Sequence, residues 1–192
     1  MVNSACVVEL KYYPHRGRAD PVAITFAALA DKMDAKYVLK FTRVASPDLV
    51  EKYDASQAFC ATSSLQIDGE AFEGKHDETM LQKAGTLTGS FPKQNSADRS
   101  RVLSILHIID EVFDALKPSC LVDDMERKKI MREDLVQDVL PALLKKLETE
   151  IEKNEGDFCV GREISIADIA VYSMVRLGYI TLIRLVFYEE LT

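Results

Sequence analysis

The spacing of apolar residues changes once along this chain, and that change constrains the fold more than any other feature. Before residue 86, short segments with a period of two alternate with short helical segments, whereas after residue 96 only the helical period occurs. The stretch between them, residues 86–96, contains Gly89, Pro92 and several small polar residues that break both periods. We therefore expect a mixed domain over residues 1–85, a linker over 86–96 and an all-helical domain over 97–192.

The N-terminal segments predict a small mixed sheet. Residues 7–12 alternate between inward apolar and outward side chains, as in a strand, and residues 18–30 form an Ala-rich apolar helical pattern. The further expected elements are a short strand at 37–39, a helical turn or two at 49–53, a hairpin at 64–72 with its turn at Asp68-Gly69, and a helix at 77–84. A β-α-β unit followed by a hairpin and a helix gives a thioredoxin-like arrangement.

Two apolar stripes at helical spacing predict the main helices of the C-terminal half. The first stripe comprises Val102, Ile105, Ile109, Val112 and Leu116, and the second comprises Val139, Leu143, Leu147 and Ile151. The first helix is expected to end at Lys117-Pro118, and Pro141 is expected to kink the second. The predicted fold class is therefore α+β with two domains, a thioredoxin-like N-terminal domain and an all-helical C-terminal domain.

Composition and charge exclude several classes of function. The chain is 47% hydrophobic and 29% charged, as in ordinary globular proteins. A net charge of -7 argues against binding to nucleic acid or to an anionic membrane surface, since both require clustered Lys and Arg. No stretch approaches the about 18 to 20 consecutive apolar residues of a membrane span, and the first residues lack the pattern of a leader. We therefore expect a cytoplasmic protein.

The metal-binding residue types are scattered. The cysteines are Cys6, Cys60, Cys120 and Cys159, and the histidines are His15, His76 and His107. No two cysteines form a C-x-x-C pair, and no histidine has a second His or Cys three or four residues further on. We expect free thiols, no metal site and no bound cofactor.

A helix start is specified by residues 164–169. Ser165 is suited to the N-cap position and Asp168 to the N3 position, from which its carboxylate can reach back to the cap. Ile164 can pack on Ile169 as a hydrophobic staple. We interpret these residues as serving folding rather than chemistry.

The amino-acid sequence of this region also resembles that of a known family. G-D-F-C-V-G at residues 156–161 and S-I-A-D-I-A-V-Y at residues 165–172 resemble the corresponding segment of cytosolic glutathione transferases. Tyr12-Tyr13 followed by R-G-R-A-D-P at residues 16–21 resembles the N-terminal signature of that family, most closely in the sigma, tyrosine-type, class. The resemblance covers nearly the whole chain. It implies a glutathione-binding N-terminal domain, a helical domain that supplies the pocket for a small hydrophobic electrophile, and a homodimer.

The resemblance assigns chemistry to Tyr12 and Arg18. Tyr12 matches the catalytic tyrosine whose hydroxyl binds the glutathione sulfur, and Arg18 matches an arginine that adds positive potential near that sulfur. A free thiol titrates near about pH 8.5, so a donor that lowers this pKa by about 2 units stabilises the thiolate by about 2.7 kcal/mol. Taken singly, a packed tyrosine and a solvated arginine would be the simpler interpretation, and it is the motif that favours catalysis.

One departure from the family concerns the loop before the hairpin. Members carry a cis-proline there, and alignment places Ser63 at that position, after Thr62. A cis bond before a residue other than proline costs about 2.5 to 4 kcal/mol, so we expect a trans bond and a different loop. Nearby, Cys60 is interpreted as a buried thiol, and Phe59 as either a core residue or an aromatic key at the subunit interface.

Other departures concern the ends of the ligand. Members place Gln-Ser or Glu-Ser where this chain has His76-Asp77, and the carboxylate of Asp77 would cap the helix and repel the γ-glutamyl carboxylate of glutathione. Leu103 stands where an acidic residue is expected, whereas Lys52 matches a lysine anchor of the family.

Two functions of different classes therefore remain open. One is a glutathione transferase that activates the glutathione thiolate, which the presence of Tyr12 and Arg18 favours. The other is a non-catalytic protein of the same fold that serves as a binding or assembly module, which Ser63, Asp77 and Leu103 favour.

Overall fold

The computed structural model describes residues 6–12, 17–29, 37–43, 64–72, 77–94 and 96–187. The chain divides into two compact units, Met1–Pro92 and Lys93–Thr192, and the division falls within the stretch where both periodicities are broken. The first unit is a thioredoxin-like α/β arrangement, and the described regular elements of the second unit are all helices, so the predicted fold class is confirmed.

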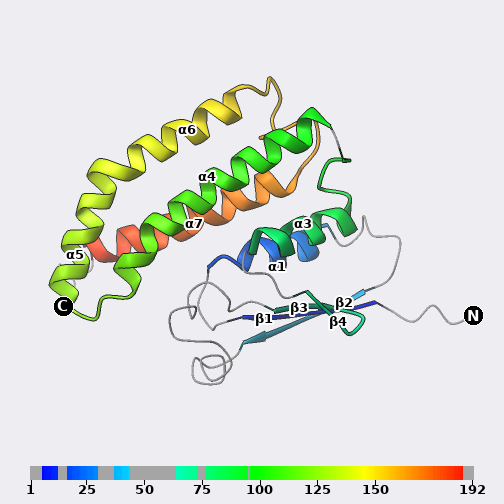
Figure 1. The fold of residues 1–192 in the computed structure, drawn as a ribbon, viewed down its shortest axis with the longest axis horizontal. Coiled ribbons are helices and arrows are strands. Elements are labelled where there is room, and N and C mark those ends of the chain that lie inside the picture. The colour runs from blue at the N-terminus through cyan, green and yellow to red at the C-terminus, as the bar shows by residue number, and fades with distance from the viewer. Residues whose placement is uncertain are drawn as a thin grey trace, which may run out of the picture. The chain divides into compact units, whose positions relative to one another are not determined.

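A four-stranded sheet forms the centre of the first unit. Its strands are β1 (Cys6–Tyr12), β2 (Tyr37–Arg43), β3 (Ser64–Ile67) and β4 (Glu70–Phe72), in the order β2-β1-β3-β4. β2 runs parallel to β1, whereas β3 is antiparallel to both of its neighbours. The helices α1 (Asp20–Ala28) and α3 (Asp77–Thr88) pack against each other, and Figure 1 shows them on the same face of the sheet. The predicted first strand and hairpin are confirmed, and β2 continues four residues beyond its predicted end.

The hairpin turn follows from two residues that tolerate positive φ. Asp68 has a φ of 51° and Gly69 a φ of 85°, as the favoured two-residue hairpin turn requires. The same turn is fastened to β1, because Val7 N donates to Asp68 Oδ1 at 2.8 Å and Asp68 N donates to Val7 O at 2.9 Å. The hairpin therefore fixes the start of β1 as well as its own two strands.

The second unit is built around one long helix. Its elements are α4 (Ala97–Cys120), α5 (Met125–Asp134), the π-helical segment η2 (Leu135–Val139), α6 (Leu140–Glu152) and α7 (Ile166–Phe187). α4 contacts both α6 and α7 and runs between them in Figure 1. Four members of the predicted stripe on α4 are buried, namely Val102, Ile105, Ile109 and Val112. The apolar face of α4 therefore forms the core of this unit, as its period predicted.

The end of α4 differs from the prediction. The helix continues through Pro118 to Cys120 instead of ending at Lys117-Pro118. Because a proline lacks a backbone N–H, Pro118 removes one hydrogen bond from the last turn, and the helix ends two residues later. Leu121 N then donates to Pro118 O at 3.2 Å and closes the helix.

The predicted kink at Pro141 takes the form of a wider turn. The segment η2 precedes α6, and Pro141 lies in the first turn of α6. A π turn holds more residues than an α turn, so it shifts which residues face the core. Leu140 is consequently buried, with 6% of its surface exposed, whereas Val139 of the predicted stripe is 42% exposed. The prediction for Val139 was therefore wrong, although Leu147 of the same stripe is buried.

Candidate functional site

The first part of the candidate site is a buried tyrosine at the C-terminal end of β1. Tyr12 is the last residue of β1, and 7% of its surface is exposed. The alternation along a strand turns Val8, Leu10 and Tyr12 to the same side of the sheet, and the first two are completely buried. Tyr12 still pairs with Arg43 of β2, whereas the pairing of β1 with β3 ends one residue earlier, at Lys11. The phenol is therefore held by core packing at the point where the chain leaves the sheet.

The turn before α1 lies against the hydroxyl of Tyr12. Asp20 N donates to Gly17 O at 3.0 Å, which closes the turn at which α1 begins. A Cβ atom built on Gly17 would collide with the hydroxyl oxygen of Tyr12 and would lie 3.3 Å from its Cζ. Arg18 follows directly and is half-buried. The structure thus places the Tyr12 hydroxyl beside the turn that carries Arg18, the other residue to which the family resemblance assigned catalysis.

The start of α3 is the second part of the predicted glutathione site. Asp77 is the first residue of α3, one position later in the helix than the predicted N-cap. The helix runs to Thr88, so it extends four residues beyond its predicted end at Ala84 and includes the first three residues of the predicted linker. A negative charge in the first turn interacts favourably with the helix dipole. Aspartate is thus a favourable residue type for the start of a helix.

The remaining predicted site residues are distributed differently. Lys52, Thr62, Ser63 and His76 lie outside the described residues, as do Phe59, Cys60 and the predicted helix at 49–53. Their assignments stay predictions. Leu103 lies on α4 in the second unit and is half-buried. Among the described residues, no group of His, Cys, Asp or Glu side chains is arranged to hold a metal ion. In the same part of the chain, no helix combines the length and apolar character needed to cross a membrane.

The predicted capping box at the start of α7 is present and is larger than expected. Asp168 Oδ2 accepts hydrogen bonds from Ser165 N at 2.8 Å and from Ser165 Oγ at 2.7 Å, so the carboxylate reaches back to the cap as predicted. Its other oxygen, Oδ1, accepts from Cys159 N at 2.7 Å. The sequence pattern gave no signal for this third bond, which ties the preceding loop to the helix.

The thiol of Cys159 is unreactive because it is buried and lies beside the same carboxylate. The Cys159 side chain is buried, with 8% of its surface exposed, and it lies near the negative charge of Asp168. Burial, and then this charge, raise the pKa of the thiol from 9.0 to about 12. Because the thiolate is the reactive form, Cys159 does not act as a nucleophile at neutral pH.

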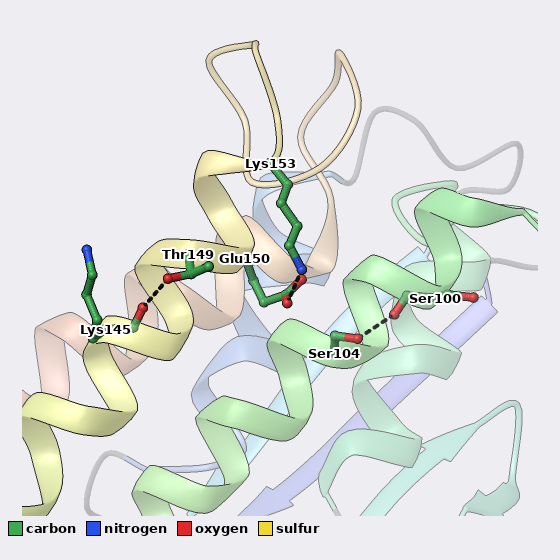
Figure 2. Close-up of polar contacts among 6 residues, drawn as sticks. All are labelled: Ser100, Ser104, Lys145, Thr149, Glu150 and Lys153. Atoms are coloured by element: carbon green, nitrogen blue, oxygen red, sulfur yellow. Dashed lines mark hydrogen bonds and ion pairs between the residues drawn. The ribbon is translucent and has the colours of Figure 1, made fainter.

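A groove lies on the surface of the helical unit, between α4 and α6. Its volume is about 510 Å³, and its lining includes Ser104, His107, Glu111, Lys146 and Thr149. Its hydroxyls bond to their own helices, since Ser104 Oγ donates to Ser100 O at 3.1 Å and Thr149 Oγ1 donates to Lys145 O at 2.8 Å, as Figure 2 shows. Lys146 Nζ lies 3.0 Å from Glu111 Oε2, and His107 Nε2 lies 3.5 Å from the other carboxylate oxygen, Glu111 Oε1. Acidic and basic groups in this groove therefore pair with each other.

Comparison with known families identifies the helical unit. Residues 110–184 match the model of the glutathione S-transferase C-terminal domain. A comparison with the curated proteins gives no match. The matched region extends from the second half of α4 nearly to the end of α7, so it includes the capping network of Asp168.

Solved structures share the fold over nearly the whole chain. Prostaglandin synthase D of Nilaparvata lugens is 15% identical with a TM-score of 0.75, over 96% of this chain and 87% of that chain. The sigma class glutathione S-transferase of Fasciola hepatica is 12% identical with a TM-score of 0.72, over 92% and 81%. Monomeric Na-GST-3, a glutathione S-transferase of the hookworm Necator americanus, is 17% identical with a TM-score of 0.67, over 94% and 84%. Residues 110–184 are thus similar to the glutathione S-transferase C-terminal domain, and the chain shares the fold of solved glutathione transferases, in agreement with the resemblance of its sequence to the cytosolic members.

Proposed function

We propose that this chain is a glutathione transferase of the tyrosine type, most similar to the sigma class. In this proposal it activates the thiolate of glutathione for attack on small hydrophobic electrophiles. The observation that carries the proposal is the hydroxyl of Tyr12, which lies against the turn before α1 with Arg18 next in sequence. The family match over residues 110–184 and the shared fold with a sigma class enzyme support it.

The proposed chemistry assigns a separate role to each residue. Tyr12 donates its phenolic hydrogen to the glutathione sulfur, which stabilises the thiolate after its proton has passed to solvent. Arg18 adds positive potential near that sulfur. The thiolate then forms a thioether bond to the electrophilic carbon, and the leaving group departs with the bonding electrons. The residues proposed to hold the rest of glutathione are Lys52, Thr62, Ser63, His76 and Asp77.

The proposed cellular setting follows the family. We propose a cytoplasmic protein that acts as a homodimer, with glutathione as co-substrate and no bound cofactor, nucleic acid or membrane partner. The hookworm protein described as monomeric shows that this fold also occurs without a partner subunit. Light scattering on the purified chain measures the mass directly, and a monomer at all concentrations would remove the dimer from the proposal.

Removal of one oxygen atom tests the role of Tyr12. Tyr12→Phe keeps the ring that packs in the core and deletes the donor, so the chain should remain folded. The glutathione pKa should then return toward about 8.5, and kcat/KM with an activated aryl chloride should fall several-fold near neutral pH. The loss should shrink above about pH 8.5, where free glutathione is already ionised. An unchanged pH profile of kcat/KM would remove Tyr12 from the mechanism.

The second candidate function is a non-catalytic member of the fold that binds other ligands or proteins. The observation that favours it is that α3 begins at Asp77, because an acidic residue type at a helix N-terminus opposes the docking of an anionic ligand there. Titration calorimetry with glutathione separates the two functions. A binding isotherm supports the transferase, whereas the lack of any heat of binding at millimolar glutathione supports the non-catalytic module.

A further inference from the structure

We propose that Gly17 is a positioning residue for the phenol of Tyr12. The lack of a side chain at residue 17 is what allows the hydroxyl to lie against the turn before α1. The reactive role of that hydroxyl rests on the function proposed above, whereas its placement by Gly17 is a property of the structure that can be tested separately.

The requirement for glycine at residue 17 is steric rather than conformational. Gly69, Gly89 and Gly161 have φ values of 85°, 72° and 75°, a region that residues with side chains rarely adopt. The φ of Gly17 lies outside that region, so its backbone conformation suits other residues. The three nearest atoms to a Cβ at residue 17 all belong to Tyr12, namely the hydroxyl oxygen, Cζ at 3.3 Å and Cε1 at 3.5 Å. The phenol alone therefore accounts for the closest contacts that a side chain here would make.

Neither partner in this contact is free to move away. Tyr12 is buried, with 7% of its surface exposed, and its side chain continues the inward row of Val8 and Leu10 on β1. On the other side, Gly17 is tied to the start of α1 by the bond from Asp20 N. α1 is in turn fixed by residues of its inner face, such as Val22 and Phe26, that are fully buried. Since protein interiors are close-packed, an added methyl group must displace either the phenol or the turn.

Displacement of the phenol would lower the reaction rate only by weakening the hydrogen bond that the Tyr12 hydroxyl donates. Hydrogen bonds weaken steeply when their angle departs from linear, and a misplacement of about 1 Å can cost a large factor in rate. We therefore expect Gly17→Ala to behave in catalysis as a partial form of Tyr12→Phe. Because Phe lacks the atom with which the methyl group collides, Tyr12→Phe should relieve the strain that Gly17→Ala introduces.

A double-mutant cycle in stability tests the placement without any substrate. The four proteins are wild type, Gly17→Ala, Tyr12→Phe and the double variant, compared by thermal unfolding. Gly17→Ala should lower the Tm by about 3 to 8 °C when residue 12 is Tyr. The same change should cost less than half as much when residue 12 is Phe, since only the contacts to Cζ at 3.3 Å and Cε1 at 3.5 Å remain. Equal losses in the two backgrounds would overturn the inference, as would two unfolded alanine variants.

The same four proteins test the catalytic consequence. The pH profile of kcat/KM for Gly17→Ala should shift toward that of Tyr12→Phe, and the double variant should match Tyr12→Phe with no further loss. A loss in the double variant equal to the product of the two single losses would contradict a role through Tyr12. If the chain proves inactive toward glutathione while the stability cycle shows coupling, the proposed function fails and the placement of the phenol by Gly17 stands.

Discussion

Substitution of Asp168 tests whether one carboxylate holds the loop and the helix of the second unit together. Asp168→Ala removes an acceptor that serves three donors, two of them backbone N–H groups, on Ser165 and Cys159. Leaving a buried donor unpaired costs about 1 to 3 kcal/mol. Because this site is only partly buried, water can reach part of it, and we expect a total loss of about 2 to 4 kcal/mol in the free energy of unfolding.

Related variants divide that loss among its sources. Ser165→Ala removes only the hydroxyl, so both backbone donors keep their acceptor and the expected loss is about 0.5 to 2 kcal/mol. Asp168→Asn keeps the shape but turns an amide N–H₂ group toward donors, so most of the full loss should appear. Asp157→Ala is the matched control, because Asp157 lies in the same loop and is exposed.

Urea unfolding followed by far-UV circular dichroism measures these differences. The expected order of loss is Asp168→Ala, then Ser165→Ala, then Asp157→Ala near zero. If Asp168→Ala and Asp157→Ala had the same midpoint, the reasoning that the carboxylate fastens the loop to α7 would be refuted. A change in the urea dependence itself, with no change in midpoint, would point to the unfolded state instead.

Two further predictions concern the same loop. Since the pKa of Cys159 is raised from 9.0 to about 12 in the folded state, the folded chain keeps a proton that the unfolded chain releases. Stability should therefore be full below pH 9 and fall as pH rises above it, by up to about 1.4 kcal/mol per pH unit, and Cys159→Ala should show a shallower fall in pH-dependent unfolding. Asn154 Nδ2 donates to Gly161 O at 2.9 Å, and Gly161 N donates to Asn154 Oδ1 at 3.0 Å. Asn154→Ala should lower the free energy of unfolding in urea by about 1 to 3 kcal/mol, whereas Glu155→Ala, at an exposed neighbour, should change it little, and equal effects would exclude this pair of bonds as the cause.

The features that the sequence predicted well depend on residues close together in the chain. The hairpin turn needs two adjacent residues that accept positive φ, and Asp68-Gly69 supplies them. The capping box needs Ser165 and Asp168 three residues apart, and both were found in their expected places. Local chemistry of this kind is visible in a short window of sequence, so no knowledge of the tertiary structure is needed.

The features that the sequence missed depend on a partner elsewhere in the chain. β2 extends to Arg43 because β1 continues to Tyr12 and offers a pairing edge, which the composition of residues 40–43 does not reveal. The role of Gly17 depends on a contact with Tyr12 that appears only when the strand and the turn are placed in space. Glycine before a helix has several explanations in sequence, and only the position of the phenol selects one of them.

The π turn between α5 and α6 also determines how the faces of the two helices are rotated relative to each other. An α-helix advances by about 100° per residue, so one extra residue in a turn rotates everything beyond it by about that angle. A uniform helical repeat would place certain residues of α5 and α6 on one common face, whereas the π turn places them on two different faces. Deletion of one residue from Leu135–Val139 would join the helices in a continuous α repeat, and it would turn the face of α5 away from its present neighbours while α6 kept its own. The number of residues in η2 therefore fixes the rotation of α5 about its axis relative to α6.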